Sequence, residues 1–359
     1  MIGIKLAYIL TAMLKGFILL VAGVLLIGSA SQAQNKKGYE YDSTFYQSYR
    51  DQLTARIYLS RKYNVIKLTP PYYTVPVMRY KPNTTLSIGI GGTYRSITVN
   101  VGVGISSFNP DHAKGKTNYF DVQAHIYTRK WNFDLIGQSY RGFYLSPQGL
   151  GSGDAKTYYT RPDLGYHAGG VAMYRALNHK EFSYQAGLVQ NEWQKKSVGS
   201  WLVGGNIFYG AIHADSVLVP GNVDAIYYQK GISKVHFFEV GPGIGYGYTL
   251  VIAQHLFVLA SATLNADFRF SKELGSYQNW NRIDFTPNFI FRAGAGYNTD
   301  KWSLSLLWVS NQVHVKGQGS DYKYLISAGN YKLIYARRFS LNKKIKKVLK
   351  PINDLITPD

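Results

Sequence analysis

Hydrophobic and polar residues alternate with a period of two along most of the chain. Long rows of apolar residues at every second position run through 256–270 and 283–297, and shorter rows lie at 97–105 and 120–126. Successive side chains of a β-strand point to opposite faces of the sheet. A period of two therefore predicts strands that each carry one apolar face.

The pattern predicts about twelve main strands and no helix between them. This order excludes the α/β enzymes, in which strands alternate with helices. Most of the strands exceed the five or six residues that are usual in soluble sheets, which favours a transmembrane barrel over a soluble sandwich or propeller. The predicted strands are 84–94, 96–107, 117–128, 130–144, 163–176, 181–193, 199–212, 232–249, 254–270, 281–298, 301–314 and 321–339.

The polar faces of these strands carry more charge than a dry soluble core tolerates. Aromatic residues near strand ends, among them Trp131, Trp201 and Trp302, fit the girdles at membrane interfaces. The sequence thus predicts an all-β fold, a transmembrane antiparallel up-and-down β-barrel of about 12 strands (12–14). Its predicted lumen network consists of Asp121, His125, Asp267, Arg269, Arg282, Asp284 and Arg292.

The strand count conflicts with one long connection. Both ends of a barrel chain should lie in the periplasm, where the turns are short. Counting back from the C-terminus places 213–231 outside but puts the long segment 145–161 in the periplasm. Either one strand is miscounted, or 145–161 is an unusual periplasmic insert; 52–60 and one hidden strand would make fourteen. Pro287 predicts a bulge in its strand.

The N-terminus has the three parts of a secretory signal. Lys5 and Lys15 precede an apolar run at 16–27, and small residues up to Ala33 form a cleavage site. The alternative is a membrane anchor. We expect residues 1–33 to be removed and the protein to reach the cell outer membrane.

The remaining chain divides into three predicted parts. Residues 34–80 are predicted as a periplasmic lead-in with room for one extra strand, 81–340 as the barrel, and 341–359 as a basic periplasmic tail. The apolar residues of that tail recur at helical spacing beside Lys343, Lys344, Lys346, Lys347 and Lys350. A basic tail of this kind could contact lipid head groups or an acidic envelope protein, or it could simply be solvated.

Composition and charge narrow the classes further. The chain has no Cys, which rules out a disulfide scaffold, a zinc site with Cys ligands and a cysteine nucleophile. Lys and Arg exceed Asp and Glu by 40 − 20 = 20, a balance that falls to +18 without Lys5 and Lys15. A basic lumen would favour anionic solutes. Alternatively, arginines and aspartates such as Arg282 and Asp284 pair with one another across the lumen.

Enzyme chemistry has little support in the sequence. Four acid–His pairs occur at short spacing: Asp121/His125, Asp163/His167, His213/Asp215 and His236/Glu239. Residues four apart in a strand, as in the first two pairs, lie about 13 Å from each other, which is too far for a catalytic hydrogen bond. His213 and Asp215 share a face at about 7 Å, which is also too far without a bend. We predict no catalytic residue, no metal, no cofactor and no nucleic acid partner.

Three stretches carry a resemblance to a known family. They are RYKPNTTLSIGIGGTYR (79–95), GKTNYFDVQAHIYTRKWNFDLIGQSYRGFYL (115–145) and FSYQAGLVQNEWQKKSVGSWLVGG (182–205). Over roughly 40–340 the chain resembles a family of predicted outer-membrane proteins of the Bacteroidota that is defined only as a domain of unknown function. The resemblance implies an outer-membrane β-barrel and brings no activity, ligand or catalytic residue.

The function that these patterns favour is a non-enzymatic small-solute channel or transporter. Barrels of eight strands are filled by side chains and porins of sixteen or more have open channels, so twelve strands lie between the two. An open lumen would support the channel, and a lumen plugged by 34–80 or by Arg–Asp pairs would count against it. One alternative is a structural or accessory subunit of an envelope complex, acting through loops 213–231 and 271–281 or the tail. Another is an outer-membrane enzyme that hydrolyses lipid or peptide.

Overall fold

The computed structural model describes residues 41–70, 75–105, 111–223, 227–276, 279–317 and 323–341. The chain divides into two compact units, one of which is Tyr41–Phe339. The other combines Met1–Glu40 with Ser340–Asp359, so it contains the predicted signal and the predicted basic tail. Apart from Ser340 and Leu341, that unit lies outside the described residues.

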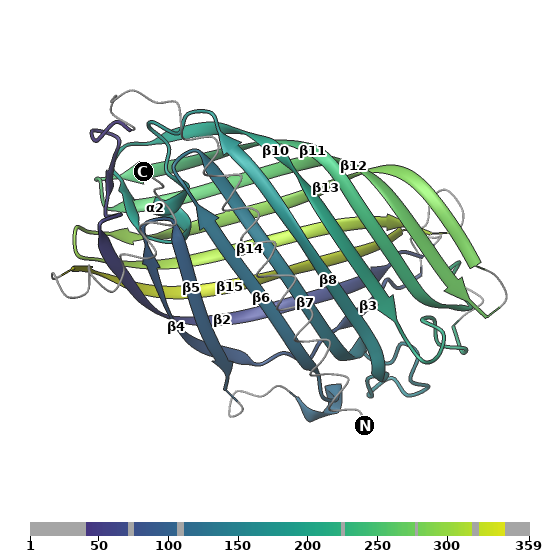
Figure 1. Ribbon diagram of the computed structural model, residues 1–359. Coiled ribbons are helices and arrows are strands. Elements are labelled where there is room, and N and C mark those ends of the chain that lie inside the picture. The colour runs from purple at the N-terminus through teal and green to yellow at the C-terminus, as the bar shows by residue number, and fades with distance from the viewer. Residues whose placement is uncertain are drawn as a thin grey trace. The chain divides into compact units, whose positions relative to one another are not determined.

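The unit Tyr41–Phe339 is built around one antiparallel sheet that closes on itself (Figure 1). The wall strands in ring order are β2 (Gln52–Leu68), β4 (Leu86–Tyr94), β5 (Ile97–Gly104), β6 (Asn118–Tyr127), β7 (Trp131–Ser146), β8 (Thr160–Ala176), β10 (Val198–His213), β11 (Ile232–Ile252), β12 (Leu256–Gly275), β13 (Asn279–Asn298), β14 (Trp302–Lys316) and β15 (Lys323–Ser340). Pairing of β15 with β2 closes the ring. This confirms the predicted antiparallel barrel of about twelve strands.

The remaining elements in the described residues are short. They are β1 (Tyr46–Ser48), β3 (Met78–Lys81), η2 (His112–Lys114), α2 (Tyr184–Leu188) and β9 (Glu192–Gln194). None of the helices described is long and apolar enough to cross a membrane. Below, the end of the barrel where β2 begins and β15 ends is the inner end, and the opposite end is the outer end.

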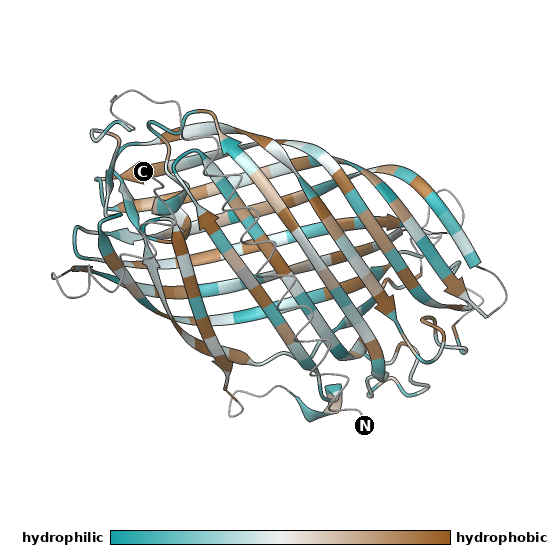
Figure 2. Ribbon diagram, in the orientation of Figure 1, coloured by the Kyte–Doolittle hydropathy of each residue, from teal (hydrophilic) through white to brown (hydrophobic). Residues whose placement is uncertain are grey.

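The two faces of the wall differ in polarity. Along β12, Phe268 and Phe270 are 57% and 49% exposed, whereas Asp267 and Arg269 are fully buried. The same alternation appears as brown and teal bands along the strands in Figure 2. Apolar side chains outside and polar side chains inside are the arrangement of a barrel that spans a membrane.

One predicted strand is wrong, and one wall strand was not counted. Segment 181–193 forms α2 and β9 inside the barrel, and the wall strand β2 lies within the predicted lead-in. Removing 181–193 from the predicted wall and adding β2 leaves an even number of wall strands. It also moves the connection 147–159 to the outer end, so the conflict over 145–161 came from a miscounted strand.

The predicted bulge at Pro287 is also wrong. The register between β12 and β13 runs through this residue without a shift, with Ala266 opposite Pro287. The disturbance lies on the other side of β13, where pairing with β14 begins only at Phe289. Proline has no N–H to donate, so a ladder that stops beside it fits its chemistry.

Both ends of the barrel interior are filled. At the outer end, β3 and Leu218 and Val219 of the β10–β11 connection lie in one apolar cluster with wall residues. The Tyr80 hydroxyl donates to the Leu218 carbonyl at 2.5 Å. We call β3 and 214–223 the outer plug.

At the inner end, α2 packs into a second apolar cluster with inward-facing wall residues. The adjacent β9 pairs with β1 in a separate two-stranded sheet. Trp193 Nε1 donates to the Gln254 carbonyl at 2.7 Å, which fixes this sheet to the β11–β12 turn. We call 177–197 the inner plug.

Candidate functional site

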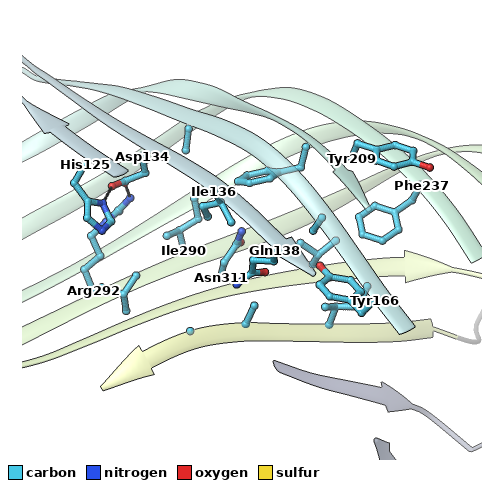
Figure 3. A pocket seen from close by; sticks show the side chains of 18 residues that line it. His125, Asp134, Ile136, Gln138, Tyr166, Tyr209, Phe237, Ile290, Arg292 and Asn311 are labelled. Atoms are coloured by element: carbon cyan, nitrogen blue, oxygen red, sulfur yellow. Dashed lines mark hydrogen bonds and ion pairs between the residues drawn. The ribbon is translucent and has the colours of Figure 1, made fainter. Parts of the chain in front are cut away.

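The first polar group inside the barrel centres on Asp134 (Figure 3). Strand register places His125 of β6 directly opposite Asp134 of β7, with His125 Nδ1 2.6 Å from Asp134 Oδ1. The Tyr127 hydroxyl donates to the same oxygen at 2.7 Å, and Arg292 Nη2 donates to the other oxygen. The cavity beside these side chains has a volume of about 40 Å³, roughly the space of one water molecule.

A second group centres on Arg269 of β12, whose side chain is fully buried. Its Nε and Nη2 donate to Glu239 Oε2 at 3.0 and 2.6 Å. Asp284 Oδ1 lies 3.7 Å from Arg269 Nη1, and Arg282 Nε lies 3.8 Å from the other oxygen of Asp284. Asp267 joins this group through Asn288, whose Nδ2 donates to Asp267 Oδ2 at 2.5 Å.

Asp121 belongs to a third group. Its Oδ1 lies 3.1 Å from Nζ of Lys62, and its Oδ2 accepts from the Tyr140 hydroxyl at 2.7 Å. The seven residues predicted as one lumen network therefore occupy three separate groups. Sequence reasoning did not find Glu239 or Lys62 as partners. Glu239 lies opposite Arg269 on the neighbouring strand β11, and Lys62 lies on β2, so both contacts depend on how separate strands are placed.

The four acid–His pairs of the sequence do not appear among the hydrogen bonds of the described residues. His125 bonds Asp134, and Asp163 accepts from Arg161 Nε at 2.9 Å. His167 and His213 stack on each other with ring centroids 4.8 Å apart. These placements assemble no nucleophile, base and acid in the order that hydrolysis requires.

In the part of the wall that the structure describes, two seams are found at which neighbouring strands stop pairing. The first lies between β13 and β14, and side chains of this chain fill it. Arg269 Nη1 donates to the His314 carbonyl, and the His314 amide donates to Asn288 Oδ1 at 3.0 Å. Arg282 Nη1 donates to the Gly317 carbonyl at 3.2 Å. The predicted lumen residues of the second group therefore also close this part of the wall.

The second seam lies between β5 and β6. Within the described residues these strands pair at two positions, Ile97 with Ile126 and Thr98 with His125. Beyond them, 99–104 and 118–124 have no register with each other, although each strand stays paired on its other side. The two ribbons run apart toward the outer end (Figure 1).

A large pocket occupies this second seam. Its volume is about 1110 Å³, which exceeds the 300–1000 Å³ that is usual for small-molecule sites. Its lining includes Lys62, Lys116, Lys332, Asp121 and the side chains of Val101 and Phe120. We call this space the side pocket.

The back of the side pocket meets the lumen through narrow spaces. Tyr58, Asn100 and Lys332 line both the side pocket and a cavity of about 30 Å³. His125 in turn lines both that small cavity and the one beside Asp134. Small cavities therefore continue from the seam into the barrel, with side chains standing between them.

Other predicted contact regions are only partly described. Lys343, Lys344, Lys346, Lys347 and Lys350 of the tail lie outside the described residues. Loop 213–231 contributes Leu218 and Val219 to the outer plug, so these residues are buried. Loop 271–281 consists mainly of the ends of β12 and β13.

A family model matches residues 40–339, which is most of the chain. The chain belongs to the family described as Domain of unknown function (DUF4421). No curated protein matches it in sequence.

Several solved outer-membrane structures share the barrel form at very low identity. OmpT of Vibrio cholerae is 10% identical with a TM-score of 0.28, covering 80% of this chain and 98% of that chain. The beta domain of the Bordetella autotransporter BrkA is 10% identical with a TM-score of 0.30, covering 80% and 99%. The Pseudomonas putida toluene transporter TodX is 8% identical with a TM-score of 0.26, covering 80% and 89%. Likeness this weak carries no argument about the function of this chain.

Proposed function

We propose that this protein is a non-enzymatic outer-membrane transporter that takes up a small amphiphilic solute through the side of its wall. The observation that carries the proposal is the open seam between β5 and β6, with a pocket of about 1110 Å³ behind it. Origin in the Bacteroidota and export by the N-terminal signal remain predictions.

The outer face supports a position in the membrane. Ile90, Val101 and Ile283 are 67%, 64% and 70% exposed, and similar residues cover the other wall strands. A soluble protein rarely leaves so continuous an apolar surface in water, whereas a bilayer requires it. Both lips of the seam carry such residues, so the seam opens within the lipid-facing band.

The interior argues against a simple axial pore. The outer and inner plugs fill the two ends of the barrel, and between them Arg269 pairs with Glu239 and Arg292 pairs with Asp134. Two cavities between the plugs, lined by described residues, have volumes of about 40 and 30 Å³, too small for a solute. The side pocket, at about 1110 Å³, offers a solute far more room than these two cavities do.

The two alternatives receive less support. An accessory subunit acting through loop 213–231 could use only part of that loop, because Leu218 and Val219 are buried within the barrel mouth. A hydrolase would need a nucleophile at His125 Nε2, because Nδ1 already bonds Asp134, and among the described residues no hydroxyl forms a hydrogen bond with that nitrogen. Neither alternative makes use of the side pocket.

Because the chain contains no Cys, engineered cysteine pairs test the side route without reaction of the cross-linker at native thiols. Val101→Cys and Val122→Cys would place one thiol on each lip of the seam. In liposomes we expect the full chain to transfer alkyl amphiphiles with a fluorescent label, whatever their head group, and a bis-maleimide across the lips to stop the transfer. The same reagent on Ala260→Cys/Ala293→Cys, a directly opposed pair of β12 and β13, is the control.

Bilayer recording completes the test. We expect the intact chain to show no steady ionic conductance, because both ends of the lumen are filled. Porin-like current steps from the intact protein, or amphiphile transfer that continues after the seam is cross-linked, would refute uptake through the side.

A further inference from the structure

The side pocket carries an excess of positive charge. Lys62, Lys116 and Lys332 line it together with one carboxylate, Asp121, which leaves 3 − 1 = +2 before His112 is counted. Lys62 is engaged with Asp121 at 3.1 Å. Lys332 projects from β15, with its Nζ 5.9 Å from the centre of the Tyr58 ring. Within the described residues, Lys332 and Lys116 have no carboxylate partner in an ion pair.

The mouth of the same pocket is apolar. Val101 on β5 and Phe120 on β6 are 64% and 47% exposed on the outer face, and Val122 lines the pocket beside them. A ligand that enters here therefore meets lipid-facing valine and phenylalanine side chains first and ammonium groups behind them. This order of surfaces matches an amphiphile with an anionic head and an apolar tail.

The open seam differs in construction from the filled one. Arginine and asparagine side chains fill the seam between β13 and β14 and bond its backbone. On the inner face of β5, Asn100 brings a side chain to the pocket, whereas Gly102 and Gly104 bring none. A Cβ at Gly104 would lie 2.6 Å from Thr85 Oγ1, so a larger residue at this position would displace the Thr85 side chain. Unpaired strand edges facing lipid are costly, which favours a polar occupant.

We propose that the side pocket binds a membrane amphiphile with a phosphate head group. The phosphate lies between Lys62, Lys116 and Lys332, and the acyl chain leaves through the gap between Val101 and Phe120. A phosphate monoester carries more than one negative charge and three acceptor oxygens, which suits several lysines better than a single carboxylate does. The inference rests on the proposed function and names the solute class of the same pocket.

The test uses the full chain in nanodiscs of neutral phosphatidylcholine. These contain a few mole per cent of a photoactivatable lipid whose label sits on the acyl chain. One probe has a phosphate monoester head, and the matched probe is the neutral diacylglycerol. We expect the phosphate probe to label 99–104 and 118–122 about tenfold more than the neutral probe, the scale of one charge-assisted hydrogen bond.

Lys116→Met/Lys332→Met should remove that preference and leave the Lys62–Asp121 pair in place. Lys230→Met/Lys234→Met removes the same charge from residues that do not line the pocket, and should leave the preference unchanged. Heat-modifiable migration on a gel verifies that each variant is folded. Competition of the wild-type labelling by dodecyl phosphate, but not by dodecyl maltoside, supplies a test that needs no variant.

The outcomes separate the two proposals. Equal labelling of the seam by both probes would contradict recognition of a phosphate head group. Uptake through the side of the wall would still be supported. If neither probe labels the seam above the lipid-facing residues of β12, both proposals fail. Displacement of the phosphate probe by inorganic phosphate, at the same concentration as dodecyl phosphate, would overturn the proposal of an amphiphilic ligand. A free anion without an acyl chain would then be enough for binding.

Discussion

Asp134 shows how single residues hold the barrel interior together. Its two oxygens bond His125 and Tyr127 of β6 and Arg292 of β13, so with Asp134 on β7 the group joins three wall strands. The Asp134 and Arg292 side chains are 8% and 3% exposed, so little water reaches them. A carboxylate in such a place is tolerable only while its partners remain, because an uncompensated buried charge is costly.

Replacing Arg292 by leucine should therefore destabilise the barrel strongly. The expected loss is about 3–5 kcal/mol, the scale for breaking a buried ion pair by removing one partner. Urea unfolding in detergent micelles, followed by gel migration, measures it. Lys114→Leu is the control, because its partner Asp111 is 48% exposed at 3.7 Å and such pairs contribute about 0–1 kcal/mol. Equal losses in the two variants would contradict this account.

The sequence predicted which face these residues occupy but not what they touch. Alternation assigned His125 and Arg292 to the lumen, because a period of two fixes the face of every residue in a strand. Spacing along a single strand suggested Asp121 as the partner of His125. The actual partner, Asp134, lies on the next strand, and its position depends on the register between strands, which one strand's spacing cannot specify.

At the scale of elements, the sequence pattern of the inner plug predicted a wall strand that the structure does not contain. Phe182, Tyr184, Ala186 and Leu188 alternate like a wall strand, but the residues between them are buried as well. Enclosure by the barrel hides all sides of α2, so alternation there reports no lipid face. A capping signal was present, because Ser183 Oγ accepts from the Ala186 amide at 3.0 Å.

Glu192 should make the inner plug sensitive to pH. Burial raises the pKa of its carboxyl, although hydrogen bonds from Ser183 and Ser48 act in the opposite direction. The native protein then keeps this proton to a higher pH than the unfolded chain does. The contribution of this proton to stability is complete below the ordinary glutamate pKa and is lost as pH rises through the native pKa.

The plug should accordingly resist limited proteolysis better at about pH 5 than at about pH 8. Glu192→Gln cannot ionise, so its resistance should change less over the same interval. Cleavage within 177–197, followed by mass spectrometry, gives the comparison. A pH response of the same size in the glutamine variant would exclude Glu192 as its source.

Arg269 has a role in the filled seam that its charge alone does not explain. Besides Glu239, it bonds the His314 carbonyl at a point where β14 has left β13. Arg269→Lys keeps the charge beside Glu239 but loses the fork that reaches both partners. We expect amide hydrogen exchange in 313–316 to rise by roughly tenfold in this variant, since local opening would cost less. Unchanged exchange there would mean that Asn288 alone holds the seam.

At the scale of the whole molecule, the alternating pattern predicted that the sheet closes into a ring. It did not predict that the lumen is filled. An even number of strands, about twelve, each with alternating apolar and polar residues, predicts a barrel with an inside and an outside. Whether that inside is open depends on where the connections fold. The residues of the outer plug come from segments that the sequence marked as a lead-in and a loop. Their inward position is a property of tertiary packing between segments far apart in the chain.

Two plugs in series lead to a non-additive prediction about conductance. Replacing 181–194 by a short Gly-Ser turn removes the inner plug, and replacing 215–231 in the same way removes the loop part of the outer plug. Each single replacement leaves the other end filled, so we expect ionic conductance in planar bilayers to stay near that of the intact chain. The double replacement should raise it at least about tenfold, because β3 and inward-facing wall side chains are then all that remain in the lumen. Current from one single replacement alone would show that the opposite plug does not seal. A silent double replacement that still migrates as a folded barrel would show that the wall side chains close the lumen by themselves.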